Sequence, residues 1–164
     1  MMKKIYLVRH AKAEQKNYER DYERDLNKKG EREIKDMLKK LKSRKFKPEC
    51  IISSAALRAA RTARLLAKGL GVKRLYFDER LYGADENALF EFITKLDDKY
   101  QEICIVGHNP ALRELCELLS QIYLNSFPTC SVFGLEFDDE SFTNLKAHSG
   151  KFLFFEHIKK LKEG

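Results

Sequence analysis

The sequence predicts an α/β fold, a three-layer α/β/α sandwich whose mostly parallel sheet has an antiparallel edge. Short apolar runs alternate with stretches of helical periodicity along most of the chain, a pattern typical of parallel strands joined by helices. The last apolar runs, at 131–137 and 151–155, follow one another with no clear helix between them, so we expect them to pair antiparallel. The length of 164 residues suits one domain, 1–164, with its own hydrophobic core.

Each predicted element rests on a local pattern. The apolar runs predicted as strands cover residues 5–8, 50–53, 74–77, 103–106, 131–137 and 151–155. The stretches predicted as helices lie near 28–43, 57–70, 86–98 and 110–122. In the first helix, Ile34, Met37 and Leu41 follow helical spacing. The second helix is expected to end at the glycines Gly69 and Gly71.

The charge pattern narrows the possible partners. The net charge of +7, from 32 basic and 25 acidic residues, suits nucleic acid, an anionic surface or a phosphorylated substrate. Along 28–45, however, both signs are mixed as on a solvated helix, and no aromatic residues interleave with the basic ones, so no nucleic acid is expected. We see no signal sequence and no apolar run long enough to span a bilayer. We therefore expect a cytoplasmic protein without a membrane partner.

The four cysteines and one short repeat carry less information. No two cysteines form a CxxC pair, and Cys50 and Cys104 lie in or beside apolar runs, so they are predicted to be reduced core residues. The tandem repeat at 18–25 (YERDYERD) is predicted to be a polar loop between the first strand and the first helix. Its place directly after Arg9 and His10 leaves a role toward the substrate open.

Polar side chains follow three of the predicted strands. Arg9 and His10 end the first strand, Arg58 lies in the first turn of the helix after the second, and His108 and Asn109 follow the fourth. The carboxyl ends of parallel strands share one edge of a sheet, where ligands bind. Arginine forks and a helix N-terminus suit a phosphoryl group, and Asn109 is predicted to cap the helix that begins at Pro110.

Other interpretations of these residues are weaker. A metal site would need a third ligand beside the two histidines, and nearby arginines would repel a cation. No phosphate-binding GxxxxGK[ST] loop occurs. The basic residues Arg61, Arg64, His148 and His157 are expected to be solvated or structural.

Four segments carry a family resemblance. They read LVRHAKAE (7–14), RDLNKKGEREI (24–34), SSAALRAARTA (53–63) and IVGHNP (105–110). In this order they resemble the histidine phosphatase superfamily of the phosphoglycerate mutase type, with Ala11 where many members have glycine. Among its members, the short chain is most similar to the SixA type of phosphohistidine phosphatase. The resemblance implies a phosphoglycerate mutase-like fold and a metal-independent phosphatase without cofactors.

The resemblance also assigns roles to individual residues. His10 would be the nucleophile that becomes phosphorylated, with His108 as the second catalytic histidine. Arg9 and Arg58, together with Asn109, would bind the substrate. The stretch ERLYGAD (79–85) is similar to the segment that carries the general acid, which would be Glu79, although Asp78 and Asp85 compete for that role.

The substrate class follows from the room available for a lid. Only the short segment 80–107 separates Glu79 from His108, so the site is expected to be open and shallow, as a side chain on another protein requires. Protein phosphohistidine is therefore the first choice. A sugar or nucleotide phosphate is the enzymatic alternative, and a non-catalytic module that binds phosphorylated or acidic partners is the alternative from a different class.

Overall fold

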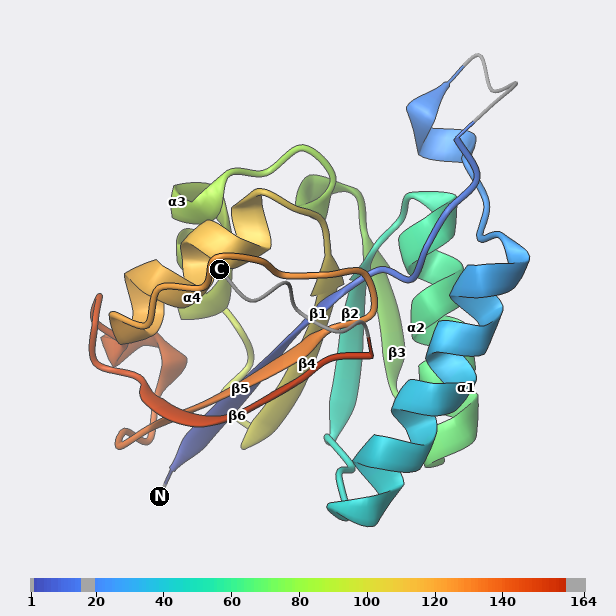
Figure 1. The fold of residues 1–164 in the computed structure, drawn as a ribbon. Helices are drawn as coiled ribbons and strands as arrows, with labels where there is room; N and C mark the ends of the chain where they lie inside the picture. Colours follow the sequence, from blue (N-terminus) through green and yellow to red (C-terminus); the bar gives the residue numbers. More distant parts are fainter. Residues whose placement is uncertain (1, 16–19, 159–164) are drawn as a thin grey trace.

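The computed structural model describes residues 2–15 and 20–158. Its central sheet has six strands in the order β3-β2-β4-β1-β5-β6 (Figure 1). The strands are β1 (Lys3–Arg9), β2 (Cys50–Ser54), β3 (Leu75–Asp78), β4 (Glu102–Gly107), β5 (Val132–Phe137) and β6 (Lys151–Glu156). The first four pair in parallel, whereas β5 runs antiparallel to both β1 and β6. The predicted parallel sheet with an antiparallel edge is confirmed.

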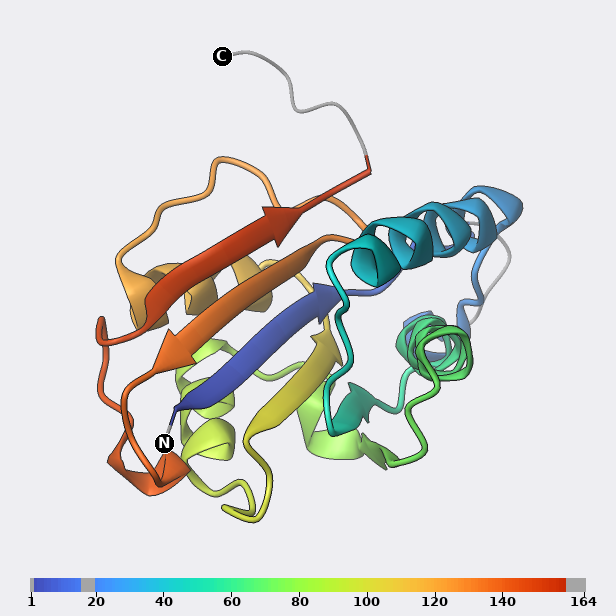
Figure 2. The same ribbon diagram turned by 90° about the horizontal axis from the view of Figure 1, so that it is seen from below.

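The helices cover both faces of this sheet (Figure 2). They are α1 (Lys28–Ser43), α2 (Leu57–Leu70), α3 (Glu86–Thr94) and α4 (Ala111–Ser120). Short 3₁₀ turns occur at η1 (Asp21–Glu23), η2 (Glu79–Leu81) and η3 (Phe142–Asn144). No helix in the described parts of the chain is long and apolar enough to cross a membrane.

Strand β1 shows why the sequence forms three layers. Successive side chains of a strand point to opposite faces. Accordingly, Tyr6 and Val8 pack in the core under α1 and α2, whereas Ile5 and Leu7 pack in the core under α3 and α4. Because both faces are covered, β1 is apolar at every position from Ile5 to Val8 rather than at alternate ones.

The predicted boundaries hold except near two helix ends. Helix α3 ends at Thr94, four residues before the predicted end, and the chain then turns at Asp97, whose carboxylate accepts a hydrogen bond from the Lys99 amide at 2.9 Å. Aspartate favours such local turns over a continuing helix. Helix α4 ends at Ser120, where Gln121 adopts a left-handed conformation with φ of 70°.

The predicted buried thiols are present. Cys50 and Cys104 are free and buried in strands. Burial raises the pKa of the Cys50 thiol to about 11 and raises that of Cys104 further. Both are therefore unreactive core residues.

Helix α1 is joined closely to the segment that follows β1. Asn27 caps the helix by accepting a hydrogen bond from the Gly30 amide at 2.8 Å, and the Lys12 carbonyl accepts one from the Asn27 amide at 3.1 Å. The backbones approach so closely that a Cβ on Gly30 would lie 2.1 Å from the Lys12 carbonyl oxygen. Only glycine fits this position.

We therefore expect Gly30→Ala to destabilise the protein, although alanine has the higher helix propensity. The side chain would push against backbone, and overpacking of this kind costs about 1–3 kcal/mol. The measurement is the free energy of unfolding in urea. Gly69→Ala is the matched control, because its Cβ would meet the terminal carbons of the flexible Leu38 side chain and should cost less. A stability of Gly30→Ala equal to or above wild type would contradict the argument.

Candidate active site

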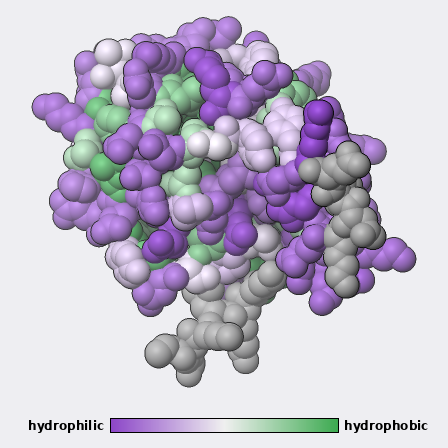
Figure 3. Space-filling model, turned by 90° about the horizontal axis from the view of Figure 1, so that it is seen from above, coloured by the Kyte–Doolittle hydropathy of each residue, from purple (hydrophilic) through white to green (hydrophobic). Residues whose placement is uncertain are grey.

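A polar cavity of about 370 Å³ lies at the carboxyl ends of the parallel strands. It is lined by Arg9, His10, Lys12, Ala13, Gln15, Arg24, Arg58, His108, Asn109 and Thr129. Five of the six residues predicted for the site therefore meet in one cavity, and the sixth, Glu79, does not line it. Figure 3 shows the molecule from above relative to Figure 1, and hydrophilic residues cover most of this face.

His10 is held in one orientation at the end of β1. The residue is 7% exposed, and its main-chain amide donates to the Gly107 carbonyl at 3.1 Å. The Nδ1 atom lies 2.7 Å from the carbonyl oxygen of Ala11, so this nitrogen carries the proton of the neutral ring. Nε2 then keeps its lone pair. Burial lowers the pKa of His10 to about 3, with a smaller contribution from the charges of Arg9 and Arg58, although the hydrogen bond to Ala11 opposes the shift.

His108 faces His10, with ring centroids 5.3 Å apart. Burial and then the charge of Arg58 lower the pKa of His108 to about 4, so its ring is also neutral near pH 7. Nε2 lies 2.8 Å from the hydroxyl of Ser54, while the buried Nδ1 has no hydrogen-bond partner among the described residues. When Ser54 donates to Nε2, the proton resides on Nδ1, which then needs an acceptor.

The two predicted phosphate arginines are buried against the protein and partly unsatisfied. Arg9 donates from Nη1 to the Phe127 carbonyl at 3.1 Å, and Arg58 donates from Nη1 and Nη2 to Asp21 at 2.7 and 2.8 Å. Within the described chain, the Nε atom of each arginine is buried without a partner. Buried donors are normally satisfied, so these two guanidinium groups have spare hydrogen-bonding capacity that an acceptor-rich ligand would suit.

Asn109 is in the cavity wall, but its predicted capping role is wrong. The N-cap position of α4 is Pro110, and no side chain caps the helix there. Asn109 instead donates its side-chain amide to the Phe127 carbonyl at 2.9 Å, the same carbonyl that Arg9 contacts. This leaves the amide oxygen of Asn109 buried without a partner in the described structure.

The three candidates for the general acid lie outside the cavity wall. Glu79 is exposed at the first position of η2. Asp78 forms an ion pair with Arg80 at 2.7 Å, and this hydrogen bond lowers the pKa of its carboxyl. Asp85 caps α3 and lines an adjoining pocket of about 260 Å³ that shares His108 with the main cavity. The structure therefore gives Glu79 no contact that assigns it the acid role.

Two further residues near the cavity had only a weak signal in the sequence. Arg24 lines the cavity, and Asp21 pairs with Arg58; both belong to the repeated segment 18–25, of which 20–25 are described. Tyr18 and Glu19, also in that repeat, lie outside the described residues. The signal was the position of this charged repeat directly after the first polar cluster. No group of three or more metal-ligating side chains occurs in the described ranges.

Comparison with known proteins identifies the family. The model of the histidine phosphatase superfamily (branch 1) matches residues 5–91, and the chain belongs to this superfamily. A protein of Mycobacterium tuberculosis, described as uncharacterised, shares 30% identity over 115 residues, which are 70% of this chain and 71% of that protein. Membership supports a phosphatase that acts on a phosphorylated substrate, as the sequence predicted.

Solved structures agree on the fold. A protein from Agrobacterium tumefaciens assigned as the phosphohistidine phosphatase SixA has a TM-score of 0.82 at 24% identity, covering 95% of this chain and 98% of that one. The protein histidine phosphatase SixA in complex with tungstate has a TM-score of 0.80 at 20% identity, covering 94% and 96%. A mycobacterial glucosyl-3-phosphoglycerate phosphatase with bound VO3 has a TM-score of 0.72 at 14% identity, covering 95% and 100%.

Because His10 and His108 are neutral in the folded protein, we expect the free energy of unfolding to fall in mild acid. An unfolded histidine protonates near pH 6.5, whereas His10 and His108 do so only near 3 and 4 when folded. As the pH falls below 6.5, the unfolded state binds protons before the folded state does. The free energy of unfolding therefore falls by up to about 1.4 kcal/mol per pH unit for each histidine. Urea unfolding at pH 7 and pH 5 measures the effect.

A variant pair makes this test specific. His10→Asn should flatten the fall in stability between pH 7 and pH 5, because one titrating group is lost. His148→Asn is the control, since His148 is exposed and its left-handed backbone, with φ of 63°, tolerates asparagine. If His10→Asn kept the wild-type pH dependence, the buried neutral state of His10 would be contradicted.

Proposed function

We propose that the protein is a metal-independent phosphatase that forms a phosphohistidine on His10. One observation carries the proposal: a buried neutral histidine with its Nδ1 proton fixed shares a cavity with two arginines that have unpartnered Nε donors. A neutral imidazole with a free Nε2 lone pair is a nucleophile, and two free guanidinium donors suit phosphoryl oxygens. Catalytic roles for Arg9, Arg58 and His108 form part of the proposal.

The proposed reaction has two steps. Nε2 of His10 attacks phosphorus in line, forming the P–N bond as the bond to the leaving group breaks. Arg9 and Arg58, with the Nδ1 proton of His108, offset the charge on the equatorial oxygens, as a metal ion would elsewhere. Water then attacks the phosphohistidine, the P–N bond breaks, and inorganic phosphate leaves with His10 neutral again.

We propose protein phosphohistidine as the substrate. Most of the segment between Glu79 and His108 belongs to η2, α3 and β4, so this segment is too short to form a lid over the cavity. The candidate acids lie outside the cavity wall, and a phosphoramidate leaves as an imidazole, which needs less help from an enzymatic acid than an alkoxide does. The four cysteines are free and buried, which supports a reducing compartment such as the cytoplasm.

A small phosphate ester is the second candidate. Lys12 and Arg24 add two cations to a cavity that already contains Arg9 and Arg58, so it offers more positive charge than one phosphoryl group requires. A sugar or nucleotide phosphate with further anionic groups would use that charge. A purely binding module is disfavoured, because recognition alone does not require a histidine with a fixed tautomer.

Trapping of the intermediate tests the proposed reaction. We expect wild type, incubated with a labelled phosphoryl donor in EDTA, to acquire label that is lost in acid and retained in base. His10→Ala should acquire no label and show no turnover, because the nucleophile is gone. His148→Ala is the control and should behave as wild type. Labelling of His10→Ala would assign the nucleophile elsewhere, and loss of labelling in EDTA would contradict the metal-free mechanism.

The variant Glu79→Gln separates the two substrate classes. If Glu79 protonates an alkoxide, its loss should slow phosphate-ester hydrolysis by about 10²–10⁴-fold, the usual contribution of a general acid. Phosphohistidine hydrolysis should fall only modestly, because its leaving group needs little help. Both rates are measured on one preparation, with His10→Ala as the blank. Equal losses on both substrates would contradict a role in leaving-group protonation, and no loss on either would transfer the acid role to Asp78, Asp85 or solvent.

A further inference from the structure

The side chain of Asp21 connects two arginines of the cavity wall. Its Oδ1 atom accepts a hydrogen bond from Arg24 Nε at 2.8 Å, and its Oδ2 atom accepts one from Arg58 Nη2 at 2.8 Å. Its main-chain carbonyl accepts another from Arg58 Nη1 at 2.7 Å. Both Arg24 and Arg58 line the cavity, whereas Asp21 does not. We propose that Asp21 is a positioning residue that holds these two arginines ready for the phosphoryl group.

The geometry at Arg58 supports this role. Its side chain is 6% exposed, and both of its terminal nitrogens are engaged by the same residue. The contact fixes the rotation of the guanidinium plane and leaves the buried Nε without a partner among the described residues. A long side chain that is ordered before the ligand arrives loses less entropy on binding. The ion pair therefore prepares Arg58 to donate to a phosphate oxygen.

A third donor fixes Asp21 itself. The hydroxyl of Tyr82 donates to Asp21 Oδ2 at 2.7 Å, and the ring of Tyr82 lies edge-on to His108 with centroids 5.5 Å apart. Although partial burial opposes the effect, the hydrogen bonds from Tyr82, Arg58 and Arg24 hold the pKa of the Asp21 carboxyl well below its usual range. The carboxylate is thus charged at every pH at which a phosphatase assay is run.

The negative charge of Asp21 also repels a phosphate. Its net effect on phosphate binding therefore depends on whether positioning of the arginines or this repulsion is larger. The Asp21 side chain is 50% exposed, and water and salt screen its charge. Arg58 is buried, and it would otherwise have to be ordered by the ligand alone. We therefore expect positioning to outweigh repulsion, so that removing the carboxylate weakens phosphate binding.

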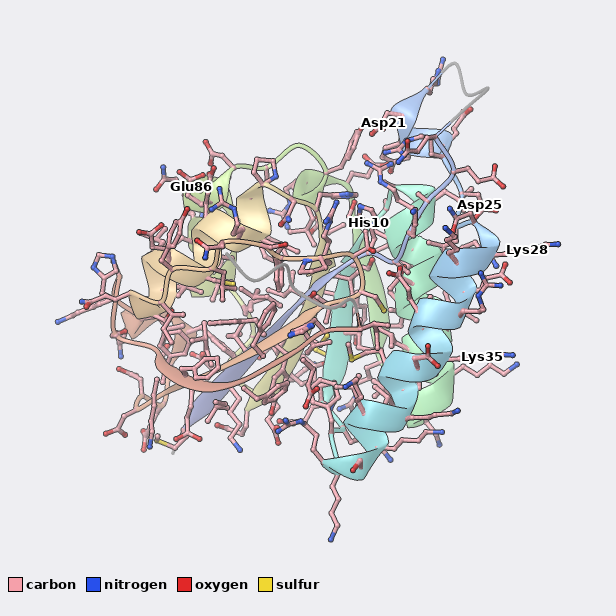
Figure 4. All side chains as sticks on the ribbon, viewed as in Figure 1. His10, Asp21, Asp25, Lys28, Lys35 and Glu86 are labelled. Atoms are coloured by element: carbon pink, nitrogen blue, oxygen red, sulfur yellow. The ribbon has the colours of Figure 1, made fainter. Side chains whose placement is uncertain are left out.

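The chain supplies a matched control in the same segment. Asp25 accepts a hydrogen bond from Arg61 at 2.7 Å, and Arg61 does not line the cavity. Figure 4 shows Asp21 at the η1 turn above His10, and Asp25 nearer the start of α1. Asp25→Asn therefore breaks an aspartate–arginine pair of similar length, whose arginine is more exposed than Arg58 and lies outside the cavity wall.

The experiment is calorimetric binding of inorganic phosphate to wild type, Asp21→Asn and Asp25→Asn, with thermal unfolding to confirm that each variant is folded. An asparagine has one acceptor oxygen for the three side-chain donors that Asp21 serves. We expect the Kd for phosphate to rise about tenfold in Asp21→Asn, as for partners that hold a ligand-binding side chain, and to stay unchanged in Asp25→Asn. The Tyr82→Phe variant should raise it less, and the double variant should not exceed Asp21→Asn alone.

The outcomes separate this inference from the proposed function on which it rests. If wild type binds no phosphate, the phosphate site fails and the inference fails with it. If wild type binds phosphate and Asp21→Asn binds it equally well, only the role of Asp21 is wrong. Tighter binding by Asp21→Asn would also overturn it, because Asp21 would then compete with phosphate for Arg58. In an assay of phosphatase activity, we expect Asp21→Asn to change mainly KM rather than kcat.

Discussion

The parallel pairing of β1 and β2 with the strand between them, β4, determines where the two histidines of the site and Ser54 lie. Arg9 is paired with Gly107, so the next residue of each strand, His10 or His108, emerges at the same level. On the other side of β4, Ser53 is paired with Val106, which brings Ser54 to the His108 ring. A shift of one residue in either pairing would turn these side chains to the opposite face and separate them.

Burial at this edge then sets the chemistry. Two histidines enclosed beside arginines lose their charge, because desolvation and like charge both disfavour the imidazolium. Beside them, the buried Nε donors of Arg9 and Arg58 have no acceptor in the described structure. In the proposed function, one oxyanion accepts hydrogen bonds from these arginines and from the Nδ1 proton of neutral His108.

The sequence was sufficient for the features that depend on local patterns. The strands, the helices and the convergence of Arg9 and His108 follow from periodicity and from the place where polar residues succeed apolar runs. It was insufficient where a contact with a residue distant in the sequence determines the position of a side chain. Asn109 precedes Pro110 as a helix-capping residue would, but its side-chain amide donates a hydrogen bond to the Phe127 carbonyl, 18 residues away. The pairing of Asp21 with Arg58 spans 37 residues and has no periodic signal. The position of Glu79 depends on a 3₁₀ turn that the sequence did not predict.

In the proposed mechanism, His10 is a neutral nucleophile with its proton held on Nδ1 by the Ala11 carbonyl. Nitrogen-15 NMR of the imidazole rings at pH 7 reports this state, because chemical shifts distinguish the two neutral tautomers from the imidazolium. We expect a protonated Nδ1 and an unprotonated Nε2 for His10, unchanged down to pH 5. A proton on Nε2, or an imidazolium at pH 7, would contradict it.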